Sequence, residues 1–260
     1  MIWRGLLVSV RDATEAEAAL EGGAAIIDVK DPTAGSLGAA SATAVAAVAA
    51  TVGPRAPWTV AAGELRDEIA RPGSVQRWLA AIAVAAVHSG TAVPAAVKIG
   101  LAGLAGSAWQ STFHELMEGL PAATARVAVA YADWQRAQAP HPLEIVTAAR
   151  HSCGVLLIDT ADKSGPDLLG ACHRRDLQAW VAEARDTGMA VALAGRVRID
   201  SIPDLGRLGP DVVALRSAVC SNSRLGPVDA TLVRRAAAAV RLLEMPHGTT
   251  RTSCSTRAEP

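Results

Sequence analysis

Short apolar runs recur along the whole chain, and their regular spacing is the feature that most restricts its fold. Most of these runs are rich in Val, Ile, Leu and Ala and show no alternation with polar residues. Strands of a parallel sheet that are buried on both faces have this near-continuous apolar character. We therefore expect eight strands, at residues 6–10, 25–30, 58–63, 95–100, 126–130, 154–160, 189–195 and 211–216.

Segments with helical spacing lie between these runs. One of them opens at Thr14, has Glu17 three positions later, and is followed by Gly22 and Gly23, which is the pattern of a capped helix. Parallel strands need crossover connections of this length. The expected helices are residues 14–21, 39–50, 73–88, 107–120, 142–151, 175–187, 199–207 and 229–243.

Eight strands that alternate with eight helices, without a linker between two halves, indicate an α/β protein built as a single (β/α)8 TIM barrel. This catalytic barrel domain would take residues 1–243. A doubly wound open sheet is the alternative. Residues 244–260 are rich in Thr, Ser and Pro and have no periodicity, so we expect a disordered C-terminal tail.

The composition argues against several classes of function. The formal net charge is zero, and the chain has one Tyr and one Phe, so it lacks the cationic and aromatic surface that binds nucleic acid. The longest apolar run, residues 78–87, is too short to cross a membrane. The first residues lack a signal-peptide layout, and four separated cysteines indicate a reduced, cytoplasmic protein. The histidines have no ligand spacing, so we expect no metal site.

Lysine is used in only three places. The chain has 25 Lys and Arg residues, and all are Arg except Lys30, Lys98 and Lys163. Arg stays protonated in proteins, whereas a desolvated Lys can lose its proton and act as a nucleophile. Barrel enzymes carry their sites at the C-terminal ends of the strands, and the three lysines fall at the expected ends of the second, fourth and sixth strands. They therefore predict a reactive site at that end of the barrel.

Two carboxylates accompany these lysines. Asp28 lies two positions before Lys30 on the same strand face, and Asp159 lies four positions before Lys163. Clustered ammonium groups and desolvation both lower the pKa of a lysine, so we expect Lys30 to be the nucleophile and Asp28 its base or proton relay. Ion pairs that merely fill the end of the barrel are the alternative. The predicted catalytic group is Lys30, Asp28, Lys98, Asp159 and Lys163.

The ends of the last two strands predict a phosphate site, because phosphate commonly binds there in such barrels. Gly195 and Arg196 follow the seventh strand, and Arg216 and Ser217 follow the eighth. Backbone N–H groups beside a small residue, with an Arg close by, suit a phosphate. We therefore expect a phosphorylated small molecule as the substrate.

Several of these segments resemble one enzyme family. They are residues 6–10, Asp28-Val29-Lys30-Asp31-Pro32, Gly35-Ser36-Leu37-Gly38, residues 97–101, residues 156–160 with Lys163, residues 193–195, and Arg216 with residues 218–220. In this order they resemble the (5-formylfuran-3-yl)methyl phosphate synthases, also called 4-(hydroxymethyl)-2-furancarboxaldehyde-phosphate synthases. The resemblance extends over about residues 6–240.

The resemblance implies a TIM-barrel lyase that condenses two molecules of glyceraldehyde 3-phosphate into a furan aldehyde phosphate, with loss of phosphate and water. It places the family's Schiff-base lysine at Lys30 and its supporting residues at Asp28, Lys98, Asp159 and Lys163. The lysine itself would supply the electron sink, so the resemblance implies no metal or organic cofactor. In the family, this reaction begins the synthesis of methanofuran-type cofactors.

Two other functions stay open at this stage. One is another Schiff-base aldolase of phosphosugars, and the other is a non-catalytic barrel that binds a phosphosugar. Arg196 and Ser217 stand where the family pattern has a small residue and a Gly, which bears on how phosphate is held. The Ala- and Val-rich helices lead us to expect a homo-oligomer.

Overall fold

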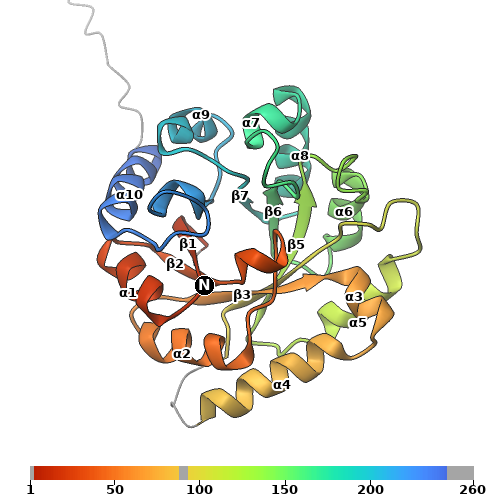
Figure 1. Ribbon diagram of the computed structural model, residues 1–260. Helices are drawn as coiled ribbons and strands as arrows, with labels where there is room; N and C mark the ends of the chain where they lie inside the picture. Colours follow the sequence, from red (N-terminus) through yellow and green to blue (C-terminus); the bar gives the residue numbers. More distant parts are fainter. Residues whose placement is uncertain (1–2, 88–92, 245–260) are drawn as a thin grey trace, which may run out of the picture.

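In the computed structural model, which describes residues 3–87 and 93–244, the strands close into one parallel barrel. β1 pairs with both β2 and β8, and Figure 1 shows the strands as a central ring with the helices around it. This confirms the predicted (β/α)8 barrel and excludes the doubly wound sheet. The strands are β1 (Gly5–Val10), β2 (Ile26–Val29), β3 (Trp58–Glu64), β4 (Ala96–Gly100), β5 (Ala125–Tyr131), β6 (Val155–Asp159), β7 (Ala190–Leu193) and β8 (Val212–Leu215).

The eight predicted helical segments are present, with shifted ends. The α-helices are α1 (Ala13–Glu21), α2 (Ala42–Val52), α3 (Leu65–Ala70), α4 (Ser74–Val87), α5 (Gln110–Glu118), α6 (Pro142–Ala149), α7 (Leu168–Ala171), α8 (Arg174–Asp186), α9 (Ile202–Gly206) and α10 (Ala230–Glu244). Short 3-10 helices occur at η1 (Pro32–Ala34), η2 (Ile199–Ser201) and η3 (Ser217–Val219).

Three details of the helix prediction were wrong. The segments α3 and α7 were not predicted, and both lie in connections beyond the ends of strands. The predicted helix at residues 199–207 divides into η2 and α9. The first helix is capped by Asp12, whose side chain accepts a hydrogen bond from the Glu15 N–H, and not by Thr14.

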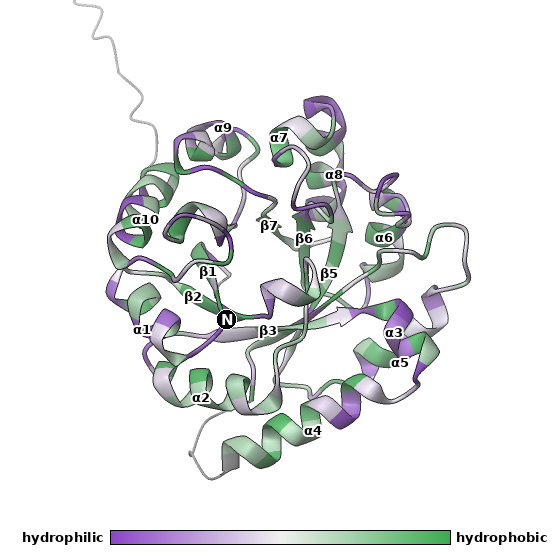
Figure 2. Ribbon diagram, in the orientation of Figure 1, coloured by the Kyte–Doolittle hydropathy of each residue, from purple (hydrophilic) through white to green (hydrophobic). Residues whose placement is uncertain are grey.

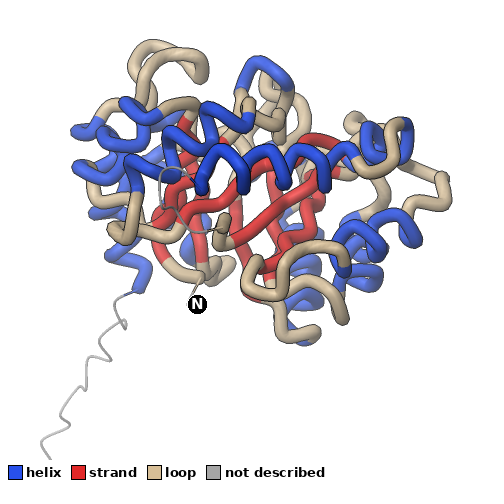
Figure 3. Tube along the Cα trace, turned by 90° about the horizontal axis from the view of Figure 1, so that it is seen from below, coloured by secondary structure: helices blue, strands red, loops and turns tan. Residues whose placement is uncertain are grey.

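Apolar side chains form two separate cores, one on each side of the barrel wall. The outer core fills the space between the strands and the helices. The inner core fills the barrel with side chains that include Leu7, Ile26, Val127 and Leu157. Figure 2 shows hydrophobic residues along the strands, and Figure 3 shows the strands enclosed by helices when the molecule is turned by 90°. The wall is thus buried on both faces, as its continuous apolar sequence predicts.

The predicted tail, residues 244–260, lies outside the described residues, apart from Glu244 at the end of α10. The boundary of the barrel domain at residue 243 therefore stays a prediction. Within residues 3–87 and 93–244, no helix combines the length and apolar character needed to span a membrane.

The first and last helices pack closely where the barrel closes. Gly22, which caps the C-terminal end of α1, faces Val233 and the carbonyl oxygen of Ala230 on α10. A Cβ atom at Gly22 would lie 2.8 Å from that oxygen and still closer to the side chain of Val233. The close approach of α1 and α10 therefore requires a residue without a side chain.

We expect Gly22→Ala to lower the free energy of unfolding by about 1–3 kcal/mol, because an added methyl group overpacks this contact. Urea denaturation followed by circular dichroism measures the change. Gly154→Ala is the matched control, since a Cβ atom there meets nothing within 4 Å and should change stability by no more than about 0.5 kcal/mol. Equal effects of the two substitutions would contradict the packing argument.

Candidate active site

A cavity of about 60 Å³ lies inside the barrel and reaches the loops at the C-terminal ends of the strands. Small or apolar residues line the part inside the barrel, and charged residues line the mouth. All nine side chains or loop residues predicted from the sequence line this one cavity: Asp28, Lys30, Lys98, Asp159, Lys163, Gly195, Arg196, Arg216 and Ser217. The residues predicted from the sequence therefore lie together in one cavity, and their catalytic and phosphate-binding roles stay predictions.

Asp28 is a buried carboxylate held by donors from three other strands. It accepts hydrogen bonds from the Ser9 hydroxyl at 2.9 Å and the Thr59 hydroxyl at 2.7 Å, and it forms an ion pair with Lys98. The ion-pair partner of Asp28 is thus Lys98 on β4, and not Lys30 two positions along its own strand. Burial by itself would raise the pKa of Asp28, but the attraction of Lys98 and Lys30 and these hydrogen bonds hold that pKa below its ordinary value.

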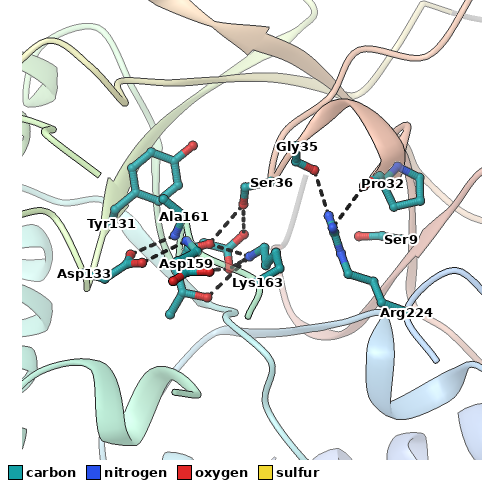
Figure 4. Close-up of polar contacts among 12 residues, drawn as sticks. Ser9, Pro32, Gly35, Ser36, Tyr131, Asp133, Asp159, Ala161, Lys163 and Arg224 are labelled. Atoms are coloured by element: carbon teal, nitrogen blue, oxygen red, sulfur yellow. Dashed lines mark hydrogen bonds and ion pairs between the residues drawn. The ribbon is translucent and has the colours of Figure 1, made fainter. Parts of the chain in front are cut away.

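Asp159 forms the second buried ion pair, at the end of β6. Its Oδ1 lies 2.6 Å from the Lys163 Nζ, and its Oδ2 accepts a hydrogen bond from the Ser36 hydroxyl at 3.1 Å. The Thr160 N–H also donates to Oδ1 at 2.7 Å. Burial opposes the charged form, yet the attraction of Lys163 and then Lys30 keeps the pKa of Asp159 low. Figure 4 shows Ser36 and Lys163 meeting at this carboxylate.

Lys30 directly follows β2 and differs from the other two lysines. Among the described residues, its Nζ has no hydrogen-bond or ion-pair partner, although it lies near both ion pairs. Burial is the largest influence and lowers the pKa of Lys30 from 10.5 to about 8. Asp159 and Asp28 oppose this shift, while Lys163 and Lys98 favour it. Lys30 can therefore lose its proton nearer to neutral pH than an ordinary lysine does.

Arg216 has its guanidinium fully engaged by the protein. Nη1 donates to Glu15 Oε2 at 2.8 Å and to the Ser9 carbonyl at 2.9 Å. Nη2 donates to Glu15 Oε1 at 3.3 Å and to the Gly226 carbonyl at 3.5 Å, and Nε donates to the Arg224 carbonyl at 2.9 Å. A guanidinium has five N–H donors, so none is left over for a phosphate. Phosphate binding by Arg216 stays a prediction, and this geometry does not favour it.

The backbone after β7 and β8 offers hydrogen-bond donors at the mouth. Among the described residues, the N–H groups of Arg196, Ser217 and Ala218 have no acceptor. Arg196 has a φ of 55°, and Gly195 before it has a φ of 99°. Left-handed backbone is uncommon for a residue with a side chain and is often kept where function requires it. A Cβ atom at Gly195 would lie 3.0 Å from the Thr160 nitrogen, so only Gly fits there.

Ser36 and Arg224 also belong to this region, although neither was predicted from the sequence as a site residue. Ser36 lies in the loop between β2 and α2 and contacts the Asp159 carboxylate. Arg224 lies in the loop between η3 and α10 and reaches the same β2–α2 loop, as Figure 4 shows. The Gly35-Ser36-Leu37-Gly38 motif was a signal for Ser36, but nothing in the local sequence singles out Arg224.

A second polar group links the C-terminal ends of β3 and β5, and its residues do not line the cavity. The hydroxyl of Tyr131 donates to Glu64 Oε1 at 2.6 Å, and Glu64 Oε2 accepts from the Ala102 N–H at 2.8 Å. Burial raises the pKa of the Glu64 carboxyl. Burial and the nearby Glu64 both raise the pKa of the Tyr131 hydroxyl. Asp133 accepts hydrogen bonds from the backbone N–H groups of the loop after β6. It thereby holds the loop that carries Lys163 (Figure 4).

The polar side chains of the site are therefore mainly amines and carboxylates. Within the described residues, no group of three or more His, Cys, Asp or Glu side chains is arranged to hold a metal ion. The arrangement instead combines one amine that can lose its proton with two fixed ion pairs and a set of free backbone donors. Such a group suits covalent catalysis on a carbonyl compound that carries a phosphate.

Several known proteins are similar to this chain over most of its length. Residues 6–237 match the family model described as 4-HFC-P synthase. The (5-formylfuran-3-yl)methyl phosphate synthase of Archaeoglobus fulgidus is 32% identical over 257 residues, which cover 94% of this chain and 99% of that protein. The enzyme of the same name from Methanocaldococcus jannaschii is 34% identical over 239 residues, covering 88% of this chain and 96% of that protein.

Solved structures support the fold alone. The 3-hexulose-6-phosphate synthase of Salmonella typhimurium superposes with a TM-score of 0.62 at 15% identity, covering 92% of this chain and 99% of that chain. The thiamine phosphate pyrophosphorylase of Pyrococcus furiosus gives a TM-score of 0.57 at 15% identity, covering 93% and 98%. At this level of identity, the likeness concerns the barrel and not the reaction.

We expect Lys30→Met and Lys98→Met to have opposite effects on stability at pH 7. Lys98→Met leaves the buried Asp28 carboxylate without its ion-pair partner, which should cost about 3–5 kcal/mol. Lys30→Met removes an unpaired buried ammonium, so the free energy of unfolding should equal or exceed that of the wild type. Urea denaturation measures both variants, and an equal loss in both would contradict the proposed difference between these lysines.

The stability advantage of Lys30→Met should disappear as the pH rises. The folded pKa of Lys30, about 8, lies below the ordinary value of 10.5, so between these values the unfolded chain binds more protons. The wild type therefore gains stability as the pH rises from 8 towards 10.5, whereas Lys30→Met lacks this gain. Urea denaturation of both proteins from pH 7 to 10 measures the free energy of unfolding at each pH. Parallel pH dependences of the wild type and Lys30→Met would contradict this prediction.

Proposed function

The chain belongs to the 4-HFC-P synthase family, and on that premise we propose that it is a (5-formylfuran-3-yl)methyl phosphate synthase. The proposed substrate is glyceraldehyde 3-phosphate, and the proposed catalyst is a Schiff base on Lys30. The observation that carries the proposal is the state of Lys30, which is buried, has a pKa of about 8 and has no direct partner among the described residues.

The overall reaction balances without any oxidant or reductant. Two molecules of glyceraldehyde 3-phosphate supply all the carbon atoms of the product. Joining them and closing the furan ring releases one phosphate and two waters. The chemistry that the protein must supply is therefore carbonyl activation, proton transfer and stabilisation of leaving groups, which amines and carboxylates provide.

The Lys30 Nζ attacks the aldehyde carbon of the first substrate, and loss of one water leaves an iminium. Loss of a proton from C2 beside the iminium expels the phosphate from C3 of the same substrate, and this C3 then becomes the nucleophilic carbon. The second substrate isomerises to its ketone form, and its C2 carbonyl carbon accepts the new C–C bond from that C3. The C1 hydroxyl oxygen of the second substrate closes the ring on C2 of the first, and two further waters leave. Hydrolysis of the iminium takes up one water, releases the product and restores Lys30, which leaves two waters as the net loss.

The two ion pairs have different roles in this proposal. The Asp28–Lys98 pair is deeply buried, with side-chain exposures of 1% and 5%. Its carboxylate already accepts three hydrogen bonds, so it serves as a fixed charge that holds Lys98 beside the reacting carbon. The Asp159–Lys163 pair lies nearer the mouth, with Lys163 14% exposed. Lys163 is thus the better placed of the two lysines to donate protons to departing oxygens.

The phosphate of one substrate binds, in this proposal, at the ends of β7 and β8. The free backbone N–H groups of Arg196, Ser217 and Ala218 supply donors, and the Arg196 side chain, which has no carboxylate partner among the described residues, supplies positive charge. Donors of this kind are strong ligands for phosphate. Arg216 contributes indirectly, because it donates to the carbonyl groups of Arg224 and Gly226 and so holds the loop between η3 and α10.

Incubation with glyceraldehyde 3-phosphate should produce a furan aldehyde absorbance and an equal amount of free phosphate. Borohydride reduction during turnover should leave an adduct on Lys30, which peptide mass spectrometry locates. Lys30→Met should abolish both product and adduct. Lys163→Met should lower kcat by about 10²–10⁴-fold, the usual contribution of a positioned acid or base, while the adduct still forms.

The same experiment separates the two other functions left open by the sequence. An adduct on Lys30 without a furan product would indicate another Schiff-base aldolase of phosphosugars. Stabilisation by glyceraldehyde 3-phosphate without any adduct would indicate a barrel that binds a phosphosugar without catalysis. An adduct on Lys98 or Lys163 would overturn the assignment of Lys30.

A further inference from the structure

The proposed reaction brings two phosphates into one barrel mouth, and the charges there show where each can bind. Three cations of the mouth are matched by carboxylates: Lys98 by Asp28, Lys163 by Asp159, and Arg216 by Glu15. Among the described residues, the other cations that line the cavity have no carboxylate within ion-pair distance. They are Lys30, Arg196 and Arg224. With Lys30 used for chemistry, two arginines remain for two phosphates.

Arg224 is held in place by carbonyl groups and not by a carboxylate. Its Nη1 donates to the Pro32 carbonyl at 3.0 Å, and its Nη2 donates to the Gly35 carbonyl at 2.7 Å. Two of the five N–H donors of the guanidinium are thus used, and three remain. Because carbonyl groups are neutral, Arg224 keeps its full positive charge while its orientation is fixed. This is the state that a preorganised phosphate ligand requires.

The loop that Arg224 contacts follows Lys30 directly in the chain. The Asp31 N–H donates to the Gly38 carbonyl at 2.8 Å, which closes the loop on itself, and buried Leu37 lines the cavity. Ser36 fastens the far side of the loop to Asp159. Figure 4 shows Arg224 reaching Pro32 and Gly35, while Ser36 faces Asp159 and Lys163. Arg224 therefore lies beside the β2–α2 loop, whereas Arg196 lies at the end of β7.

We propose that Arg224 is the specificity-determining ligand for the phosphate of the second triose phosphate, while Arg196 and the backbone donors beside it hold the phosphate of the first. The inference rests on the proposed function, since only a condensation of two phosphorylated substrates needs two such ligands. Arg216, with every N–H engaged by the protein, cannot fill this role. Its contribution is to hold the carbonyl group of Arg224.

The matched variants are Arg224→Gln, Arg224→Lys and Arg207→Gln. Arg207 caps the C-terminal end of α9, its side chain is 72% exposed, and it does not line the cavity, so its substitution removes the same charge from a remote site. Two reactions are measured for each protein. Borohydride trapping on Lys30 reports the first substrate, and furan formation with varied glyceraldehyde 3-phosphate reports the second.

Arg224→Gln should leave trapping within about twofold of the wild type and lower kcat/KM for furan formation by about 10- to 100-fold, the range lost with a hydrogen bond to a charged group. Arg224→Lys should lose less than Arg224→Gln, because the charge is kept. Arg207→Gln should match the wild type in both reactions. A further readout uses mixed adducts, in which unphosphorylated glyceraldehyde serves as the second aldehyde, and mass spectrometry measures them. A purely structural role of Arg224 would leave the preference between the two aldehydes unchanged. Arg224→Gln should remove the preference for the phosphorylated second aldehyde.

Equal losses of trapping and of furan formation in both Arg224 variants would overturn the inference, because Arg224 would then act only by fastening the loop. Unchanged furan formation in Arg224→Gln would also overturn it, while leaving the proposed function intact. A wild-type protein that forms no furan would overturn the proposed function and, with it, the second substrate that the inference requires.

Discussion

An ionised Asp28 inside a closed barrel is stable only because donors from three other strands reach it. Burial of an unpaired carboxylate is so costly that the group would otherwise take up a proton. The hydroxyls of Ser9 and Thr59 and the ammonium of Lys98 supply the compensation. The interaction depends on the register that sets Ser9 and Thr59 opposite Asp28, and it determines where the positive charge of Lys98 is fixed.

The chemistry of the site follows from how this charge is shared. Lys98 and Lys163 are each matched by a carboxylate, and Lys30 is left between the two pairs without a direct partner among the described residues. Burial without a direct partner favours the neutral amine and lowers the pKa of Lys30. One barrel mouth therefore holds two ion-paired lysines and one amine that can lose its proton. A Schiff-base mechanism needs both kinds of group.

The loops at the mouth are tied together by contacts between distant parts of the chain. Arg216 joins the end of β8 to α1 through Glu15, and Arg224 joins the following loop to the loop after β2. Ser36 then joins that loop to the end of β6. Each of these contacts uses a charged or hydroxyl side chain, and together they hold the loops at the mouth in defined positions. Substrate binding would thus act on a mouth that is already ordered, which reduces the entropic cost of binding.

The sequence by itself determined the barrel, because repeated burial on both faces of each strand leaves a periodic apolar record along the chain. It also predicted a polar site from three lysines at the ends of alternate strands, and these lysines line one cavity. Which partner each charge has was decided by tertiary structure alone. Asp28 pairs with Lys98 across the barrel instead of its neighbour Lys30, and Arg216 is occupied by Glu15. Arg224 and Pro32 meet although 192 positions separate them. Such contacts depend on how the closed barrel brings its loops together, and local periodicity carries no record of that geometry.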